Sequence, residues 1–400
     1  MKVISIFDPT AADEKSRVRG IGRYFNTLKE GFQNLGAKQM DTPPSGISPY
    51  ATQSQNPADN FFFQFTGNLK EIKKQNIFLN PFFNPIQKPL KVGKIAQKQI
   101  AVIHDLIPMK YPKMFPVGIK GMIWKFLNKW SLRNYELIIT DSLVSKRDII
   151  HFYKLPENKV QVIYPTVSRI FTPHLDRENE SVTHHHPFHT EADHSIAEFT
   201  EISIQTITKN PTLQNLKEFV IYVGDATWNK NLPTIAQAIK IANVPCVFVG
   251  SVFGEANTTK AITKPNKWTR SLQNFLKLAE NDDRFIFPGF VSDTELKYLY
   301  KKAKVNILVS YDEGFGLSYI EAGFMSTPSV LADVPIFHEI AKDAADFAPA
   351  NNPKEVAQKI SSLFYDNLHQ EKMSIKAFDR AQEFHPKRFQ NAWIEILKVA

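Results

Sequence analysis

Two glutamates, Glu313 and Glu321, lie in the sequence EGFGLSYIE around a predicted strand-to-helix turn. The run Asn306–Val309 predicts a buried parallel strand, and Asp312–Gly316 predicts a tight loop with two glycines. A helix is predicted over Leu317–Phe324. Both carboxylates are therefore expected beside the start of one helix.

The same turn offers hydrogen-bond donors. The first backbone N–H groups of a helix have no partner within it, and the helix dipole adds partial positive charge at that end. Here these groups belong to Gly314, Phe315, Gly316 and Leu317. An anionic or polyhydroxylated ligand is favoured at such a place, and two neighbouring carboxylates suit sugar hydroxyls. The alternative is that the glutamates only form a solvated face.

A second segment, Arg19–Phe25, opens a helix predicted to run to about Leu35. Gly20 and Gly22 allow the backbone to approach a phosphate closely, because no Cβ stands in the way. The third glycine of G-x-G-x-x-G is replaced by Phe25, so a dinucleotide fingerprint is not matched. The alternative is an ordinary helix start.

Two further residues follow predicted strands. His104 comes directly after the run Ile100–Ile103, at the carboxyl end of a strand, where α/β folds expose ligand groups. Lys230 lies in the turn after the strand Phe219–Gly224, where an ammonium group can neutralise a leaving diphosphate. The alternatives are a hydrogen-bonded structural histidine and a solvated lysine.

Taken together, these segments resemble the family 4 glycosyltransferases, which have the GT-B fold and mostly retain the anomeric configuration. EGFGLSYIE looks like their E-x7-E motif, and RGIGRYF looks like their first Gly-rich loop. HDLIPMKYP is similar to the H-D-L-I-P-L-x-Y-P sequence of mannosyltransferase-like members. VGDATWNKNL resembles V-G-x-x-x-x-R-K-N-L, and FPGFVSDTEL resembles F-x-G-x-V-x-D-x-E-L.

Two positions depart from the family pattern. Asn229 stands where an arginine often precedes the lysine, which leaves one phosphate cation to be supplied by Arg23 or Arg19. Ser326 stands where a glycine usually precedes Thr-Pro, and the geometry at the end of the preceding helix is expected to differ there.

The resemblance implies a role for each matched residue. Glu313 would contact the sugar near its reacting carbon, His104 the sugar or its 6-hydroxyl, and Glu321 the ribose. Lys230 would stabilise the departing phosphates with backbone amides and without a metal. The donor-binding residues implied are Gly20, Gly22, Gly224, Asn231, Val291, Gly314, Phe315, Gly316, Leu317 and Glu321.

The 400 residues predict an α/β fold with two Rossmann-like, doubly wound domains, and the resemblance implies that these face each other across a cleft. Residues 1–173 would form the acceptor-side domain and residues 217–381 the nucleotide-sugar-binding domain. Between them, 174–216 is rich in His, Ser and Thr and predicts a linker or insertion rather than a metal site. By resemblance, 382–400 would be a helix crossing back to the first domain.

Charge is concentrated in the first half of the chain. Of the formal net charge of +9, Lys91–Val160 carries thirteen basic and five acidic residues, so 13 − 5 = +8. A basic face suits nucleic acid, an anionic membrane or a phosphorylated substrate. Within it, Gly118–Asn134 has lysines on one helical side and large apolar residues largely on another. This pattern fits an interfacial helix, and equally a surface helix that covers a core.

The opening run MKVISIFDPT is too short for a signal h-region and indicates a first strand. No apolar run approaches the roughly 20 residues of a membrane span. The one cysteine, Cys246, lies in an apolar run and fits a reducing compartment as a small buried residue. The expected location is the cytoplasm, with peripheral contact at the inner face of the membrane.

The predicted function is retaining transfer of a hexose from a nucleotide-sugar donor to a glycan or lipid-linked acceptor in cell-surface polysaccharide synthesis. The HDLIP segment favours GDP-mannose as the donor. The alternatives are a non-catalytic sugar-nucleotide-binding protein of the same fold, a sugar-nucleotide epimerase, and a basic nucleic-acid-binding protein. The sequence contains no aromatic stacking motif or zinc module, which argues against nucleic acid as a partner.

Overall fold

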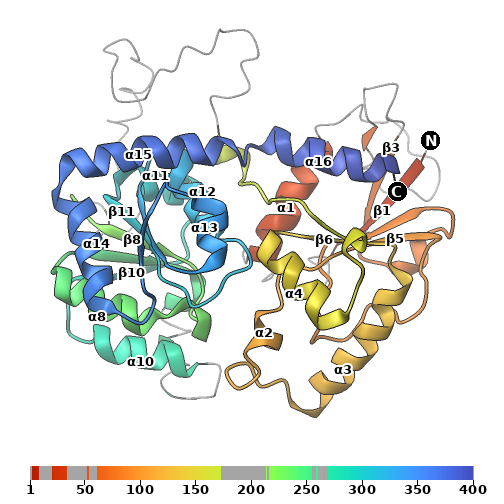
Figure 1. Ribbon diagram of the computed structural model, residues 1–400, viewed down its shortest axis with the longest axis horizontal. Coiled ribbons are helices and arrows are strands. Elements are labelled where there is room, and N and C mark those ends of the chain that lie inside the picture. The colour runs from red at the N-terminus through yellow and green to blue at the C-terminus, as the bar shows by residue number, and fades with distance from the viewer. Residues whose placement is uncertain are drawn as a thin grey trace, which may run out of the picture. The chain divides into compact units, whose positions relative to one another are not determined.

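The computed structural model describes residues 2–8, 20–33, 52–53, 61–172, 213, 216–254, 258–259, 263 and 269–399. Its contacts divide the chain into two units (Figure 1). Unit 1 comprises residues 1–168, 313–317 and 384–400, and unit 2 comprises 169–312 and 318–383. The sequence predicted boundaries at 173 and 382. Nearly all of the predicted linker 174–216 lies outside the described residues.

Unit 1 is built on a seven-stranded sheet that is parallel except for one short edge strand. In sheet order the strands are β2 (Thr52–Gln53), β3 (Phe61–Thr66), β1 (Lys2–Phe7), β4 (Ile77–Asn80), β5 (Lys98–Val102), β6 (Leu137–Thr140) and β7 (Val160–Val162). The antiparallel β2 lies at the edge of the sheet, and residues 41–51 and 54–60 around it lie outside the described residues.

The helices of unit 1 connect these strands on both faces of the sheet (Figure 1). They are α1 (Gly20–Gln33), α2 (Ile107–Lys110), α3 (Gly118–Ser131), α4 (Leu143–Tyr153) and α16 (Pro386–Val399), with single turns η2 (Leu69–Glu71), η3 (Leu132–Asn134) and η4 (Glu157–Lys159). Ser142 caps α4, because its side chain accepts a hydrogen bond from the N–H of Ser145 at 3.0 Å.

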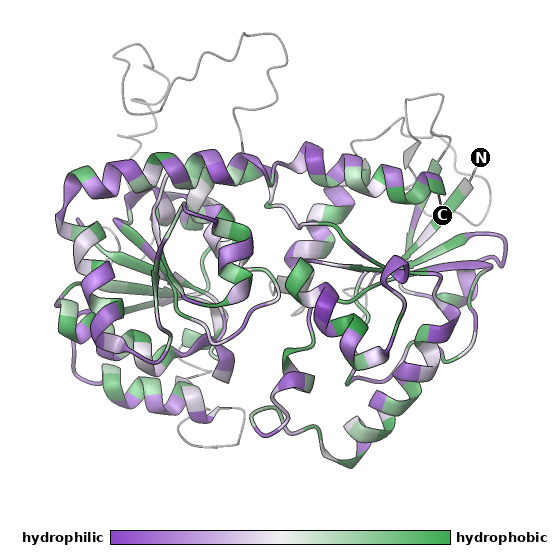
Figure 2. Ribbon diagram, viewed as in Figure 1, coloured by the Kyte–Doolittle hydropathy of each residue, from purple (hydrophilic) through white to green (hydrophobic). Residues whose placement is uncertain are grey.

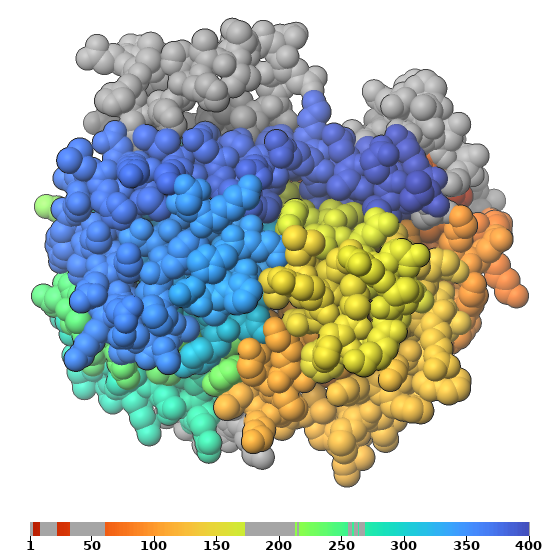
Figure 3. Space-filling model, in the orientation of Figure 1, coloured from red at the N-terminus to blue at the C-terminus, as the bar shows by residue number. Residues whose placement is uncertain are grey.

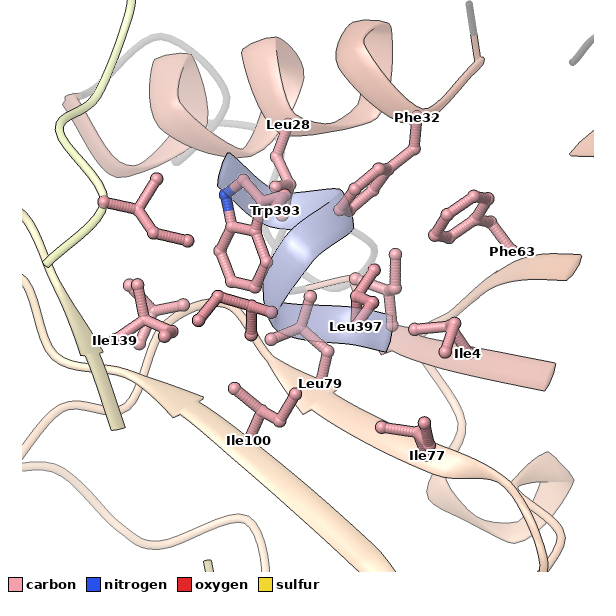
Figure 4. Close-up of a cluster of buried hydrophobic side chains, with 14 of the residues drawn as sticks. Ile4, Leu28, Phe32, Phe63, Ile77, Leu79, Ile100, Ile139, Trp393 and Leu397 are labelled. Carbon is pink, nitrogen blue, oxygen red and sulfur yellow. The ribbon is translucent and has the colours of Figure 1, made fainter. Parts of the chain in front are cut away.

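Alternate residues of each strand face opposite sides of the sheet, so unit 1 has two apolar clusters. Ile77 and Leu79 of β4 pack toward α1 and α16, whereas Phe78 packs toward α4. Figure 4 shows the first cluster, in which Trp393 of α16 lies beside Leu28 and Phe32 of α1. The C-terminal helix thus forms part of the core of unit 1.

Unit 2 is built on a six-stranded, wholly parallel sheet. In sheet order the strands are β10 (Phe285–Gly289), β9 (Cys246–Val249), β8 (Val220–Val223), β11 (Val305–Leu308), β12 (Ser329–Ala332) and β13 (Asp346–Ala348). Cys246 is fully buried, as expected of a small apolar residue, and burial raises the pKa of its thiol well above the usual range.

The helices of unit 2 are α8 (Leu232–Ala242), α10 (Arg270–Ala279), α11 (Asp293–Lys302), α12 (Leu317–Phe324), α13 (Pro335–Ala341), α14 (Pro353–Tyr365) and α15 (Asn367–Gln382), with turns η5 (Arg169–Phe171), η6 (Trp228–Lys230) and η7 (Ser251–Phe253). Figure 2 shows apolar strands flanked by helices with one apolar and one polar side. Among the described residues, no helix is both long and apolar enough to cross a bilayer.

In each sheet, the direction in which successive strands are added reverses once. In unit 1 the chain moves from β1 to β3 on one side and returns to β4 on the other, and in unit 2 β8 has β9 on one side and β11 on the other. In open α/β sheets ligands bind beyond the carboxyl ends of the strands at such switch points. The turns after β8 and β11 are the ones that carry Lys230 and Glu313.

Candidate active site

The turn from β11 to α12 carries the first of the predicted glutamates. Helix α12 covers Leu317–Phe324, as the sequence predicts, and Gly316 adopts the left-handed φ of 102° just before it. Glycine is suited to that conformation because a Cβ would strain it. Glu313 is almost fully buried and is grouped by its contacts with unit 1.

In unit 1 this turn lies against the segment that follows β5. A Cβ atom added to Gly314 would lie 3.2 Å from both Cβ and Oδ2 of Asp105, and 3.4 Å from the carbonyl oxygen of His104. The backbone of the turn therefore approaches His104–Asp105 so closely that a side chain at position 314 would require Asp105 to shift. Two motifs separated by about two hundred residues meet here.

His104 is held by a carboxylate from the neighbouring strand. Its Nδ1 lies 2.8 Å from Oδ2 of Asp141, which follows β6. Burial by itself would lower the pKa of His104, but the negative charge and hydrogen bond of Asp141 outweigh it, with smaller contributions from Asp105 and the Pro81 carbonyl. The pKa of His104 is therefore raised from its ordinary value of 6.5.

Aromatic rings enclose the same imidazole. Tyr24 of α1 meets His104 edge to face at a centroid distance of 4.6 Å, and Phe82 stacks on it at 5.9 Å. Tyr24 follows two residues after Gly22 near the start of α1. The Gly-rich segment, His104 and the turn after β11 are thus associated within one unit.

A second buried acid, Asp105, adjoins His104. Its Oδ1 accepts a hydrogen bond from the N–H of Ile107 at 2.9 Å. Burial raises the pKa of Asp105, and the charge of Glu313 raises it further, while the N–H of Ile107 and the charge of His104 oppose these effects. Glu313 and Asp105 are therefore close enough for their charges to interact.

In unit 2 the turn after β8 is hydrogen-bonded to residues 309–312, the segment that directly precedes Glu313. The side-chain amide of Asn231 donates to the carbonyls of Val309 and Ala350, at 2.9 and 2.6 Å. Asn229 accepts a hydrogen bond on its backbone carbonyl from the N–H of Tyr311. These bonds fix the path of residues 309–312 against the turn.

Asn229 occupies the position where the resemblance led us to expect an arginine. Its side-chain amide donates to the carbonyl of Asp312 at 3.0 Å, and the hydroxyl of Thr227 donates to its Oδ1 at 2.8 Å. Beside it, Trp228 stacks on Tyr311 with ring centroids 4.9 Å apart. The side chain of Asn229 therefore stabilises the contact between this turn and Asp312. Lys230, partly exposed at the end of η6, is the basic residue of the turn.

Glu321 is buried on α12, where the hydroxyl of Tyr300 donates to its Oε2 at 3.0 Å. That bond fixes the orientation of the carboxylate. Val291 is buried in the loop between β10 and α11. The next residue, Ser292, forms a capping box with Glu295 at the start of α11.

The glycines predicted to bind the donor occupy different structural settings. A Cβ on Gly224 would lie 2.8 Å from the Tyr222 hydroxyl, and one on the adjacent Gly250 would lie 2.3 Å from the carbonyl oxygen of Gly224. Close backbone packing thus explains this pair. Gly20 and Gly22 lie in the first turn of α1, whereas Arg19 lies outside the described residues.

The described part of the chain contains no group of three or more His, Cys, Asp or Glu residues arranged to hold a metal ion. The histidines at 184–194 lie outside that part.

Comparison with known proteins supports the resemblance to glycosyltransferases that the sequence motifs indicated. Residues 203–380 match the family model described as "Glycosyl transferases group 1". This part of the chain is thus similar to the group 1 glycosyl transferases.

The matched residues include Lys230, Val291, Glu313 and Glu321, while Gly22 and His104 lie outside them. Among curated proteins, the chain is 24% identical over 270 residues to the O-antigen chain mannosyltransferase RfbU of Salmonella typhimurium. The match covers 67% of this chain and 62% of that protein, so the chain spans less than two thirds of this relative's length. The O-antigen chain mannosyltransferase B of Escherichia coli is 20% identical over 294 residues, which cover 72% of this chain and 67% of that protein.

Solved structures show the fold. The crystal structure of Anabaena HepE in complex with UDP-glucose superposes with a TM-score of 0.64 at 14% identity, covering both chains completely. Sucrose-phosphate synthase of Thermosynechococcus elongatus gives a TM-score of 0.61 at 15% identity, covering all of this chain and 98% of the other. The predicted GT-B fold, with two Rossmann-like units, is confirmed.

Sequence reasoning overlooked the roles of three residues of the candidate site. Asp141 was not identified as a site residue, although it follows a strand adjacent to that of His104. Tyr24 stood inside the Gly-rich segment and was read as part of a helix start. Asn229 was treated as a missing cation, and no sequence signal showed that its amide would bind Asp312.

Proposed function

We propose that this protein is a retaining glycosyltransferase that moves a hexose from a nucleotide-sugar donor to a glycan or lipid-linked acceptor. The observation that carries the proposal is the contact of the turn Glu313–Leu317 with His104–Asp105 in unit 1. It joins the carboxylate of the E-x7-E motif to the histidine of the HDLIP segment. The match to the group 1 glycosyl transferases supports the same reaction class.

Glycosyl transfer separates charge: positive charge develops on the sugar ring and negative charge on the leaving diphosphate. We assign the phosphates to Lys230 and to the backbone N–H groups of Gly314–Leu317, where α12 begins. Donors fixed by the fold stabilise the leaving group without reorganising during the reaction. The N-terminal backbone of α1 at Gly20 and Gly22 is assigned to the same phosphates.

We assign the sugar to Glu313 and His104. Glu313 lies almost fully buried, where its negative charge acts strongly on a developing oxocarbenium ion. His104 is held by Asp141 through Nδ1, which orients its other ring nitrogen, and that nitrogen would donate to a sugar hydroxyl. The resemblance to mostly retaining enzymes supports retention of configuration.

The nucleoside is assigned to residues of unit 2. Glu321, oriented by Tyr300, would accept hydrogen bonds from the ribose hydroxyls. The backbone at Val291 would meet the base. Gly224 allows the chain after β8 to pass close to the ligand, and Asn231 acts indirectly, because its amide is used to hold Val309 and Ala350.

Mannose is the sugar that we propose. Two relatives carry the name O-antigen chain mannosyltransferase, and HDLIPMKYP resembles the mannosyltransferase-like sequence. A role in the synthesis of a cell-surface polysaccharide follows from the same relatives. GDP-mannose is the proposed donor, although the solved HepE complexes contain UDP or UDP-glucose.

A panel of sugar nucleotides tests this proposal. GDP-mannose should raise the unfolding temperature of the purified chain, since a ligand that binds only the folded state stabilises it by mass action. The same donor should release its nucleotide faster when a mannose-containing oligosaccharide or lipid-linked acceptor is added. A non-catalytic binding protein would show the shift without turnover, and absence of both with every donor would reject the proposal.

A further inference from the structure

Helix α3 carries its large apolar side chains on the outside. Ile119, Met122, Ile123, Phe126 and Trp130 are 75, 59, 53, 61 and 51% exposed, respectively. Its buried residues are instead Gly121, Asn128 and Ser131. Figure 3 shows this helix on the visible surface of unit 1, and Figure 2 shows apolar and polar residues alternating along it. The core-covering interpretation of this segment is therefore wrong.

Hydrogen bonds hold the helix in this rotation. The side-chain amide of Asn128 donates to the carbonyls of Asn84, Pro85 and Gln87 at 3.2, 3.1 and 2.7 Å. The hydroxyl of Ser131 donates to the carbonyl of Lys91 at 2.9 Å. Turning the apolar side inward would break these buried or part-buried hydrogen bonds and leave carbonyls unsatisfied.

The exposed apolar residues form one stripe, which we call the outer stripe: Ile119, Met122, Ile123, Phe126 and Trp130. At about 100° per residue, they occupy an arc of roughly 100° on the helix. On the same wheel Lys125 and Lys129 fall on one border of this arc and Lys120 on the other. Arg133 lies over the Trp130 ring at 4.9 Å.

The charge around the outer stripe has one sign. Between Asp105 and Glu136 the sequence contains no acidic residue but six lysines and arginines. Of these, Lys110 forms an ion pair with Asp148 at 2.8 Å. Within the described part of the chain, Lys113, Lys120, Lys125 and Lys129 form no ion pair.

From this placement we infer that α3 is a docking surface for a membrane that contains anionic phospholipids. Aliphatic and aromatic side chains on one helix face enter the boundary between headgroups and acyl chains, and Trp favours that interface. Lysines at the borders meet the negatively charged headgroups, each raising the affinity by about fivefold near such a surface. The inference is independent of the transfer reaction proposed above.

Charge complementarity selects this occupant over a second copy of the chain. A symmetric dimer through the outer stripe would place the same patch on both partners, so lysines would face lysines. A nucleic acid would satisfy the lysines but would leave Ile119, Met122 and Ile123 against a polar backbone. An anionic bilayer accommodates both: its acyl chains contact the apolar side chains of the outer stripe, and its headgroups contact the lysines at the borders.

Vesicle flotation with the purified full-length chain tests the inference. One vesicle set contains only phosphatidylcholine, and the other contains phosphatidylcholine and phosphatidylglycerol in equal parts. The chain should float with the anionic vesicles and bind them at least tenfold more tightly than the neutral ones. Binding should weaken when salt is raised from about 0.1 M to about 1 M, because the Debye length falls from about 10 to about 3 Å.

Two double variants separate the contributions. Phe126→Ser with Trp130→Ser should reduce affinity for anionic vesicles at least tenfold, and Lys125→Glu with Lys129→Glu should do the same. The matched controls are Tyr365→Ser with Leu368→Ser, which are 63 and 81% exposed in unit 2, and Lys359→Glu with Lys372→Glu, which lie on α14 and α15. All four substitute exposed side chains, and equal unfolding temperatures would show that each variant is folded.

Failure of the wild-type chain to bind anionic vesicles would overturn the inference, as would equal binding by the Phe126→Ser, Trp130→Ser variant and its control. A concentration-dependent dimer that this variant abolishes, without vesicle binding, would assign the stripe to a second copy instead. Nucleotide-sugar binding is measured separately, so loss of vesicle binding leaves the proposed transfer reaction untouched.

Discussion

The imidazole of His104 lies 2.8 Å from the carboxylate of Asp141, and the two residues follow neighbouring parallel strands, β5 and β6. This pair fixes the ring beside the turn that carries Glu313. The first prediction concerns the protonation of His104.

The pKa of His104 is raised, so the folded state binds this proton more tightly than the unfolded state. The stabilisation is therefore full below the ordinary value of 6.5 and is lost as pH rises through the raised value. In the Asp141→Asn variant, burial dominates and the pKa of His104 should fall. NMR titration of the His104 ring in both proteins measures this. An unchanged titration curve in the variant would show that Asp141 does not hold the proton.

Gly314→Ala should weaken transfer at least tenfold and lower the free energy of unfolding by about 1–3 kcal/mol, because the added methyl group is forced against Asp105. Gly93→Ala is the matched control, since a Cβ there has no heavy atom within 4 Å. Donor-dependent activity and urea unfolding measure both effects. If the two variants behave alike, the close approach of the turn to His104–Asp105 is incorrect.

Asn231→Ala should lower the free energy of unfolding by about 2–4 kcal/mol, because the buried carbonyl of Val309 and the part-buried carbonyl of Ala350 lose their donor. Asn243→Ala provides the control: Asn243 has the same left-handed φ of 55° but is exposed. Its side chain accepts one exposed hydrogen bond, from Arg284 at 2.8 Å, so its substitution should cost only about 1 kcal/mol. Urea unfolding of both variants measures the difference, and equal costs would contradict the bracing role.

Ser326 adopts a left-handed φ of 57° at the end of α12, while the N–H groups of Ser326 and Thr327 still bond to the carbonyls of Gly323 and Ala322. The helix end therefore has the geometry that a glycine would favour. Ser326→Gly should raise the free energy of unfolding by about 0.5–1 kcal/mol. Ser361→Gly, inside α14, should lower it by a similar amount. A loss of stability in Ser326→Gly would contradict this account.

Much of this fold could be predicted from the sequence where apolar runs end at Gly, Asn or Asp. Helix α12 was predicted to the residue, because strand, glycine loop and apolar helix follow each other directly. Helix α15 was not predicted, since its sixteen residues are mostly polar and only Met373, Ser374, Ala377 and Ala381 are buried. It packs closely on α12, where a Cβ on Gly323 would lie 2.8 Å from the Ala377 carbonyl oxygen.

The candidate site could be predicted only residue by residue. His104 and Glu313 were identified from motifs and strand ends, but their association depends on tertiary packing that spacing does not encode. The exposure of Phe126 and Trp130 was equally hidden, because a helical wheel shows that a stripe exists but not which way it faces. The polar contacts of Asn128 decide that direction.

The central claim is that Glu313 acts on the reacting sugar and not on the fold. Transfer by the Glu313→Ala variant tests it most directly, with calorimetric titration of the nucleotide beside it and Glu371→Ala, an exposed glutamate of α15, as control. The account predicts that transfer falls by about a hundredfold or more while nucleotide affinity stays within a few-fold. Full transfer by Glu313→Ala would contradict it.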